Sequence, residues 1–309
     1  MEEINGLIAQ LWYTRDTRSS KPNPLDEVKS LIFYLDILYR NVYDNLISDI
    51  DIIKSSSNFN INFGSWVGAD KDGNPYVTTK ITKEALKIYS NQIITIYKEK
   101  IIELSDDFSV STNFVDCPDL LLRRIKNYSI LLKREFTHYS KVNFDEPFRI
   151  FLSLVFHRLE NFQLNNKGYK SFNEFLEDIE IFQNSVNEVF GKNFRISKLD
   201  DFVDYVKQFE FHGVALDIRQ NSSVINSKKG KIYQDFINLI KEIPELQNIY
   251  GHKVFNSIIL SMTKSHQDIL NLFNLCNSLI PDKNIPSLTP LIEEIEELQS
   301  SHLILNEML

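Results

Sequence analysis

Residues that end helices are scarce in this sequence, and this scarcity constrains the fold more than any other feature. Only nine glycines and nine prolines occur in 309 residues, roughly half of their typical usage of about 7% and about 5%. Few breakers over this length favour long helices. The length suggests one large domain or two ordinary ones, and 43% hydrophobic residues are enough to bury a sizeable core.

Apolar residues recur at spacings of three and four along most of the chain, which is the period of an amphipathic helix. The tracts with this pattern are residues 23–47, 83–104, 119–136, 146–162, 171–191, 197–209 and 265–280. Ser171, Ser197 and Ser265 stand where N-caps are expected, and Glu174 completes a capping box. Gly191 is expected to close the helix that Ser171 opens.

Four short, mostly apolar segments interrupt the helical period and are predicted to be strands. They lie near residues 60–68, 209–220, 256–263 and 287–294. Each leads toward a helix, which is typical of parallel strands buried on both faces and joined by helical crossovers. The sequence therefore predicts a mainly helical chain with a few buried parallel strands, arranged as a parallel barrel or a doubly wound sheet. Polar side chains at the strand ends are the candidates for function.

Charge and composition exclude several classes of protein. The net charge of −8 and pI near 5.4 argue against nucleic-acid binding. No apolar run approaches the roughly 20 residues of a membrane span, and the acidic start, "MEEINGLIAQ", predicts no secretion signal. Cys117 and Cys276 are far apart, as expected of free thiols in a cytoplasmic protein. The six histidines show no metal-binding spacing.

The segment "GADKDGNP" after the first predicted strand concentrates turn chemistry. A calcium loop would need glycine at its sixth position and a carboxylate at its twelfth, where this sequence has Pro75 and Ile81. A structural corner fits better. Asp and Asn side chains there bond their own backbone, and Gly73 takes a positive φ.

Two other strand ends carry charged side chains. On the second predicted strand Asp217 and Arg219 share a face with Ala215. They form either a structural ion pair or a site in which the guanidinium binds an oxyanion or phosphate. On the fourth, Leu291 and Glu293 share a face. The carboxylate of Glu293 either binds a hard cation or belongs to a solvated helix start.

Taken together and in order, these stretches resemble phosphoenolpyruvate carboxylases. The family's F-x-S-W-x-G-G-D-R-D-G-N-P-x-V-T is similar to "FGSWVGADKDGNPYVT", and its L-D-I-R-Q-E/N-S to the end of "FEFHGVALDIRQNS". The family's I-S-M segment resembles "IILSMTKSHQDIL", and its P-L-F-E-T segment resembles "TPLIEEIEEL". Its E-P-Y-R segment resembles the start of "EPFRIFLSLVFHRLEN". Near the start, "LIAQLWYTRDTRSSKPNPLDEVK" resembles its L-W-x-T-D-E-x-R and K-P-x-P-x-D-E stretch. The resemblance runs along nearly the whole chain.

The resemblance implies an enzyme that joins bicarbonate to phosphoenolpyruvate with magnesium or manganese. The products are phosphate and oxaloacetate, which feeds the tricarboxylic acid cycle. By matching positions, Arg219 contacts substrate phosphate, Glu293 is one of two metal-binding carboxylates, and Trp66 and Leu291 form an apolar wall beside the methylene carbon. The implied fold is a partial (β/α)8-type barrel surrounded by long helices, with residues 1–309 forming a single partial domain.

Several positions depart from the family pattern. Ala69 replaces a glycine and Lys71 an arginine, which keeps the charge but loses the bidentate fork. Ile292 and Glu294 replace the phenylalanine and threonine beside the metal-binding glutamate. An added carboxylate at Glu294 is expected to disturb a metal site.

The resemblance covers only the middle portion of the family sequence. The family's catalytic histidine, in T-A-H-P-T, falls upstream, and the second metal-binding aspartate and the G-R-G-G-S loop fall downstream. We therefore expect no catalytic residue within this chain and half of a metal site at Glu293. A homo-oligomer or a complementing chain is expected as partner. The alternative is a non-catalytic remnant or assembly module.

Overall fold

The computed structural model of the chain describes residues 2–13, 23–43, 45, 61–164, 168–191 and 196–308. Its helices are α1 (Glu2–Tyr13), α2 (Pro24–Ile37), η1 (Leu38–Tyr43), α4 (Thr79–Asp107), α5 (Asp119–Leu131), α6 (Lys133–Val142), α7 (Pro147–Gln163), α8 (Phe172–Phe190), α9 (Ser197–Phe209), α10 (Ser222–Ser227), α11 (Gly230–Tyr250), η3 (His252–Val254), α12 (His266–Leu279), η4 (Asp282–Asn284) and α13 (Ile295–Met308). Its strands are β1 (Gly64–Ser65), β2 (Ala215–Asn221), β3 (Phe255–Ser261) and β4 (Ser287–Pro290).

The four strands form one parallel sheet in the order β1-β2-β3-β4. Each strand pairs with the next in sequence, and the helices that follow them, α4, α11 and α12, pack side by side. Leu216 and Ile218 of β2 and Ile258 and Leu260 of β3 are fully buried, which explains why these two strands are almost continuously apolar. A mainly helical chain with a small parallel sheet is thus confirmed.

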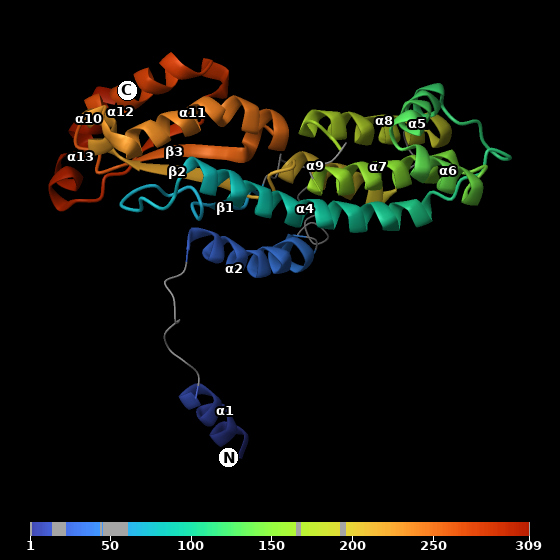
Figure 1. The fold of residues 1–309 in the computed structure, drawn as a ribbon, viewed down its shortest axis with the longest axis horizontal. Helices are drawn as coiled ribbons and strands as arrows, with labels where there is room; N and C mark the ends of the chain where they lie inside the picture. The colour runs from blue at the N-terminus through green and yellow to red at the C-terminus, as the bar shows by residue number, and fades with distance from the viewer. Residues whose placement is uncertain are drawn as a thin grey trace.

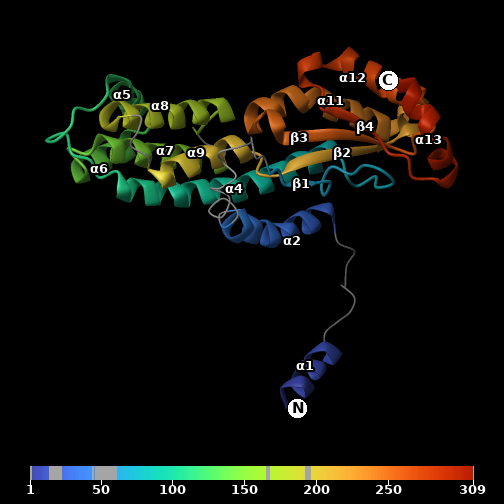
Figure 2. The ribbon, with the colours of Figure 1, turned by 180° about the vertical axis from the view of Figure 1, so that it is seen from behind.

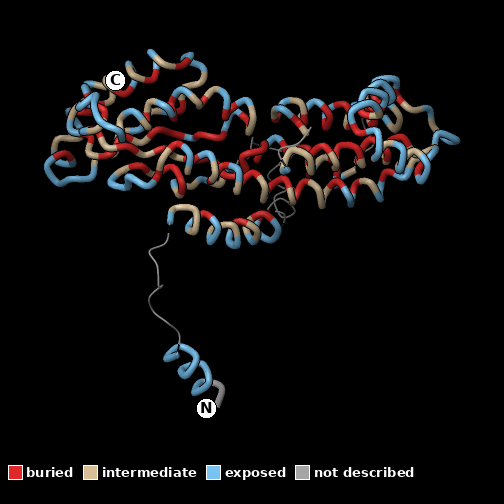
Figure 3. Tube along the Cα trace, viewed as in Figure 1, coloured by how far each residue is buried: buried red, intermediate tan, exposed pale blue. Residues whose placement is uncertain are grey.

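Helices α5 to α9 form a second region at the other end of the molecule (Figure 1). The 29-residue α4 runs beneath both regions, α7 and α9 pack along its far part, and α5, α6 and α8 pack on α7 (Figures 1 and 2). Buried positions line the inner sides of these helices in Figure 3. Stacked aromatic rings fill this core, for example Phe151 on Phe182 with centroids 6.0 Å apart.

A group of polar side chains lies inside this helical region and is called here the helix-core network. Asp178 of α8 is fully buried and accepts hydrogen bonds from Tyr128 at 2.5 Å and Tyr169 at 2.6 Å. Arg158 of α7 donates to the hydroxyl of Tyr128 at 2.7 Å and lies over the ring of Tyr169. Arg124 of α5 completes the network, with its Nε 3.3 Å from Asp178. The network joins α5, α7 and α8.

The predicted helix ends are partly right. Ser171 caps α8, Gly191 ends it at φ 85°, and Ser265 forms a capping box with Asp268 at the start of α12. Ser197 does not cap α9, because it is already the first helical residue and Ile196 is the N-cap.

Two helical tracts differ from the prediction. The tract 119–136 is not one helix, because the backbone breaks at Leu132 and lets α5 and α6 pack separately on α7. The predicted tract 23–47 is α2 continued by η1, and residues 44, 46 and 47 lie outside the described residues.

Each predicted strand segment overlaps an observed strand, although the observed strands are shorter, and residue 60 of the first segment lies outside the described residues. Helix α1 lies apart from the rest of the structure in both ribbon views (Figures 1 and 2). No described helix combines the length and the apolar character needed to cross a membrane.

Candidate functional site

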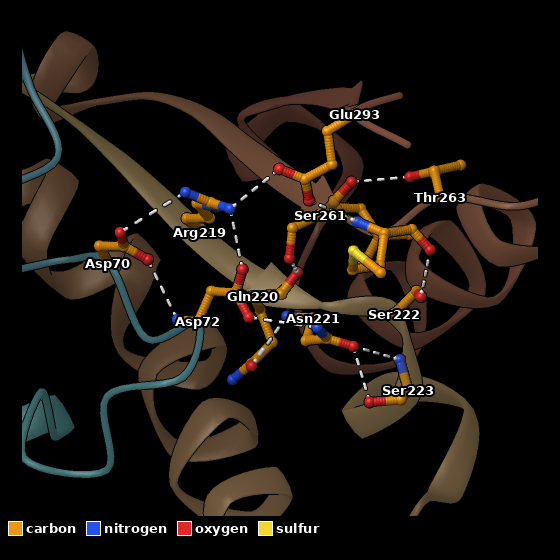
Figure 4. A network of polar contacts seen from close by, with 12 residues as sticks. Asp70, Asp72, Arg219, Gln220, Asn221, Ser222, Ser223, Ser261, Thr263 and Glu293 are labelled. Atoms are coloured by element: carbon orange, nitrogen blue, oxygen red, sulfur yellow. Dashed lines mark hydrogen bonds and ion pairs between the residues drawn. The ribbon is translucent and has the colours of Figure 1, made fainter. Parts of the chain in front are cut away.

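The loops that follow the four strands meet at one edge of the sheet, because the carboxyl ends of parallel strands lie at the same edge. Four charged side chains gather there and are called the strand-end cluster (Figure 4). They are Asp70 and Asp72 from the loop after β1, Arg219 near the end of β2, and Glu293 from the loop after β4.

The loop after β1 is the structural corner predicted from its composition. The amides of Ala69 and Asp70 both donate to the Trp66 carbonyl at 2.9 Å. The carboxylate of Asp70 accepts the amide of Asp72 at 3.0 Å, and Gly73 has a φ of +66°. These local bonds are the turn chemistry expected of Asp and Gly.

Close packing against α4 fixes the beginning of this corner. Gly68 has a φ of +93°, and a Cβ atom placed there would lie 2.5 Å from the Cβ of Ala85. The hydroxyl of Tyr89, also on α4, donates to the Val67 carbonyl at 3.0 Å. A residue larger than glycine would therefore push the corner away from the helix.

Beyond Gly68 the corner runs alongside β2 as an extra piece of parallel strand. The amide of Arg219 donates to the Ala69 carbonyl at 3.3 Å, and the amide of Lys71 donates to the Arg219 carbonyl at 2.9 Å. Asp70 and Asp72 consequently face Arg219, whereas the side chain of Lys71 between them points the other way.

Arg219 is the centre of the strand-end cluster. Its Nη2 lies 2.9 Å from Asp72 and 3.3 Å from Glu293, and its Nη1 lies 3.9 Å from Asp70 (Figure 4). The side chains of Arg219 and Glu293 are 30% and 32% exposed. Nε of Arg219 is buried and has no hydrogen-bond partner within the described residues. The guanidinium is thus held by three carboxylates, and its side chain stays partly exposed to solvent.

Glu293 is positioned by the end of β3. Its Oε1 accepts the amide of Met262 at 3.1 Å, and Met262 has the positive φ of 54°. The hydroxyl of Ser222 donates to the Met262 carbonyl at 2.6 Å and fixes this unusual backbone. Three strand ends therefore converge on one carboxylate.

Burial shifts the pKa of two groups in the corner. Burial raises the pKa of Asp70 above its ordinary value, against the opposing effects of the Asp72 amide and the Arg219 guanidinium. Burial lowers the pKa of Lys71, and its ion pair with Asp235 opposes that shift.

The other residues singled out in the sequence lie around the cluster. Trp66 precedes the corner and is 63% exposed, and the amide of Leu291 donates to the Leu260 carbonyl of β3 at 2.9 Å. No hydrogen bond or ion pair joins Trp66 or Leu291 to Arg219 in the described part of the chain. Glu294 lies 3.9 Å from Lys264.

The alternative of an Asp217–Arg219 pair is wrong. Asp217 accepts hydrogen bonds from Asn256 at 3.0 Å and from Ser257 at 2.6 Å, both next to β2 in the sheet. Asp70 and Asp72, interpreted from the sequence as turn residues only, are the partners of Arg219 instead. The sequence gives no sign of this pairing, because the corner and β2 are about 150 residues apart.

The described residues contain no group of three or more His, Cys, Asp or Glu side chains able to hold a metal ion. The carboxylates of Asp70, Asp72 and Glu293 are all paired with Arg219.

The sequence model of the family described as phosphoenolpyruvate carboxylase matches residues 1–234. This chain belongs to the phosphoenolpyruvate carboxylase family. The matched part contains β1, β2 and the corner, with Trp66 and Arg219, whereas Leu291 and Glu293 lie beyond it.

Curated relatives extend the similarity over nearly the whole chain. The phosphoenolpyruvate carboxylase of Nostoc sp. is 24% identical over 96% of this chain and 36% of its own length. The enzyme of a Prochlorococcus marinus strain is 24% identical over 99% of this chain and 40% of its own length. The enzyme of a Synechococcus sp. is 22% identical over 97% of this chain and 36% of its own length. The chain thus spans little more than a third of the curated relatives it matches.

Proposed function

We propose that this chain supplies the middle part of a phosphoenolpyruvate carboxylase and contributes one side of its phosphoenolpyruvate site. One observation supports this most strongly. Nη2 of Arg219 lies 3.3 Å from Oε2 of Glu293 at the carboxyl edge of the sheet. The two residues come from two stretches that resemble family motifs and are 74 residues apart. A cation-binding carboxylate beside an anion-binding guanidinium is what a metal-bound phosphate ester requires.

The residues of this chain have separate roles in the proposed site. Arg219 binds the phosphate of phosphoenolpyruvate through its terminal nitrogens, and Asp70 and Asp72 hold its orientation. Trp66 and Leu291 form the apolar wall that keeps water from the methylene carbon. The indole of Trp66 is exposed, which leaves a face for the bound substrate to cover. Bicarbonate is the second substrate of the complete enzyme.

Glu293 fits one position in the coordination sphere of Mg²⁺ or Mn²⁺, because its carboxylate is a hard oxygen ligand and a third of its side chain is exposed. When bound, the dication neutralises the phosphate and enolate oxygens. The remaining ligands come from substrate, from water, and from a carboxylate outside the described residues. Occupation of the site requires Glu293 to turn from Arg219 to the metal.

The arrangement of the sheet supports a larger assembly. Consecutive parallel strands followed by helices are the repeating unit of a (β/α)8 barrel, and residues 1–309 form one partial domain of it. We expect a complementing chain or another copy to complete the barrel, and a complementing chain to supply the catalytic histidine.

Binding of phosphoenolpyruvate tests the site. Equilibrium dialysis with Mn²⁺ is expected to show saturable binding by the wild-type chain, loss of that binding in Arg219→Ala, and weaker binding when the metal is chelated. Equal binding by wild type and Arg219→Ala would contradict the assignment of Arg219.

Native mass and composition after gentle purification from the source cells test the assembly. Co-purification of chains that bear the catalytic histidine and the glycine-rich loop is expected for a split enzyme. A second function, a non-catalytic assembly module, is favoured by the neutralisation of Arg219 by three carboxylates. That function predicts a chain that binds no phosphoenolpyruvate and purifies without those partners.

A further inference from the structure

Lys71 lies between the two aspartates of the corner but takes no part in the strand-end cluster. Its side chain is 2% exposed, although it carries an ammonium group. A buried ammonium group is retained only where it is paired and hydrogen-bonded. The partners of Lys71 therefore indicate what the position does.

The ammonium group has two partners, both on the side away from Arg219. It donates to the carboxylate of Asp235 on α11 at 2.8 Å and to the carbonyl of Val77 at the end of the corner, also at 2.8 Å. The Lys71 ammonium group thus links its own part of the corner to Val77, at the end of the corner, and to α11, 164 residues further along the chain.

Asp235 fixes the same corner at a second point. Its carboxylate oxygens accept the amide of Thr79 at 3.0 and 3.1 Å, and its carbonyl accepts the Thr79 hydroxyl at 2.8 Å. Thr79 is the first residue of α4, so this carboxylate also satisfies a free amide at the helix N-terminus.

We propose that Lys71 and Asp235 are positioning residues for the phosphate-binding arginine, because they hold the corner so that Asp70 and Asp72 face Arg219. This inference rests on the proposed function of Arg219. The alternation along the extended segment supplies the mechanism: residues 70 and 72 point to the cluster only while residue 71 points to α11. Without the anchor, the carboxylates that orient the guanidinium would move.

Lys71→Met tests this inference, because it removes the charge and keeps most of the side-chain volume. Lys71→Arg is the conservative variant that retains the ion pair. Lys83→Met is the control, since Lys83 of α4 also pairs with a carboxylate of α11, that of Glu242 at 2.6 Å, and does not belong to the corner. The first measurement is backbone amide exchange, without ligand, of residues 66–78 and of the middle of α4.

In Lys71→Met the corner amides are expected to exchange at least tenfold faster, with no change in the middle of α4. The dissociation constant for phosphoenolpyruvate in the presence of Mn²⁺ is expected to rise at least fivefold. Lys71→Arg is expected to stay within twofold of wild type in both measurements, and Lys83→Met to leave the corner unchanged. General destabilisation would accelerate exchange in α4 as well, and would not be rescued by arginine.

The inference would be overturned if the corner amides of Lys71→Met exchanged at the wild-type rate. It would also be overturned if Lys83→Met accelerated the exchange of these amides as much as Lys71→Met does. Asp235→Asn is the second variant if Lys71→Met does not fold, because asparagine retains an acceptor for the Thr79 amide. Absence of phosphoenolpyruvate binding by the wild-type chain would overturn the proposed function alone. The exchange comparison contains no ligand, so faster exchange confined to residues 66–78 would still support the anchoring role.

Discussion

The helix-core network and the strand-end cluster are built from the same types of charged residue but differ in their surroundings. Each contains arginine and aspartate at close range, but Asp178 is fully buried and the Arg158 side chain is 7% exposed, against 30% for Arg219. Arg158 has partners on several sides, including two tyrosine rings and Glu174. Among the described residues, the side-chain partners of the Arg219 guanidinium are carboxylates, which contact both of its terminal nitrogens.

The difference shows how location decides the role of an ion pair. Inside the helices the polar atoms are enclosed by aromatic residues, so breaking a bond leaves a buried charge or hydroxyl without a partner. At the strand ends solvent reaches the pair and can replace a lost partner. The first arrangement specifies how α5, α7 and α8 pack, and the second keeps its charges partly exposed to solvent, as the proposed substrate site requires.

The largest expected effect is on the helix-core network. Asp178→Ala removes the acceptor of Tyr128 and Tyr169 and leaves two arginines with fewer partners, so we expect the free energy of unfolding to fall by about 3–5 kcal/mol. Urea denaturation measures this change. Glu177→Ala is the control, because Glu177 pairs with Arg124 but is 60% exposed, and its loss is expected to cost less than about 1 kcal/mol. Similar losses in the two variants would contradict the comparison.

The next effect separates stability from binding at the strand-end cluster. Arg219→Ala is expected to lower the free energy of unfolding by about 1 kcal/mol or less. It is also expected to weaken phosphoenolpyruvate binding by about 2 kcal/mol or more, roughly thirtyfold. Urea denaturation and equilibrium dialysis on the same preparation give both values. A large loss of stability with unchanged binding would show that the cluster is structural.

The pH dependence of stability provides a smaller effect with a definite sign. Burial raises the pKa of Asp178, so the folded chain binds this proton more tightly than the unfolded chain. The contribution of Asp178 to stability is therefore greatest below the unfolded pKa and falls as pH rises through the folded pKa.

Relative to Asp178→Asn, the unfolding free energy of wild type is expected to decrease with rising pH, by at most about 1.4 kcal/mol per pH unit, and then to level. Urea denaturation of both proteins from roughly pH 4 to pH 8 measures the difference. A difference that increases with pH would contradict the assignment of burial as the dominant cause.

The smallest expected effect concerns Asp217, which belongs to the sheet and not to the cluster. Because its carboxylate binds Asn256 and Ser257, Asp217→Asn is expected to leave the dissociation constant for phosphoenolpyruvate within about twofold of wild type. Dialysis alongside Arg219→Ala provides the comparison. A tenfold weakening would place Asp217 in the site after all.

Much of the local structure was predictable, because it depends on residues close in sequence. The period of three and four identified α4, α7 and α8, and the turn residues of "DKDGNP" identified the corner. The break at Leu132 was not predictable, since its cause is the packing of α5 and α6 on α7. For the site, the sequence and the family resemblance indicated Arg219 and Glu293, whose substrate and metal roles remain predictions.

The sequence by itself therefore determined the helices, the parallel strands, the corner and the family. The tertiary structure alone decided which charges meet: Arg219 with Asp72 and Glu293 at the strand ends, and Lys71 with Asp235 behind them. The physical reason is the range of the interactions. Periodicity and turn chemistry act within a few residues, whereas these ion pairs join segments 74 to 164 residues apart, and only the packing of the helices on the sheet brings them together.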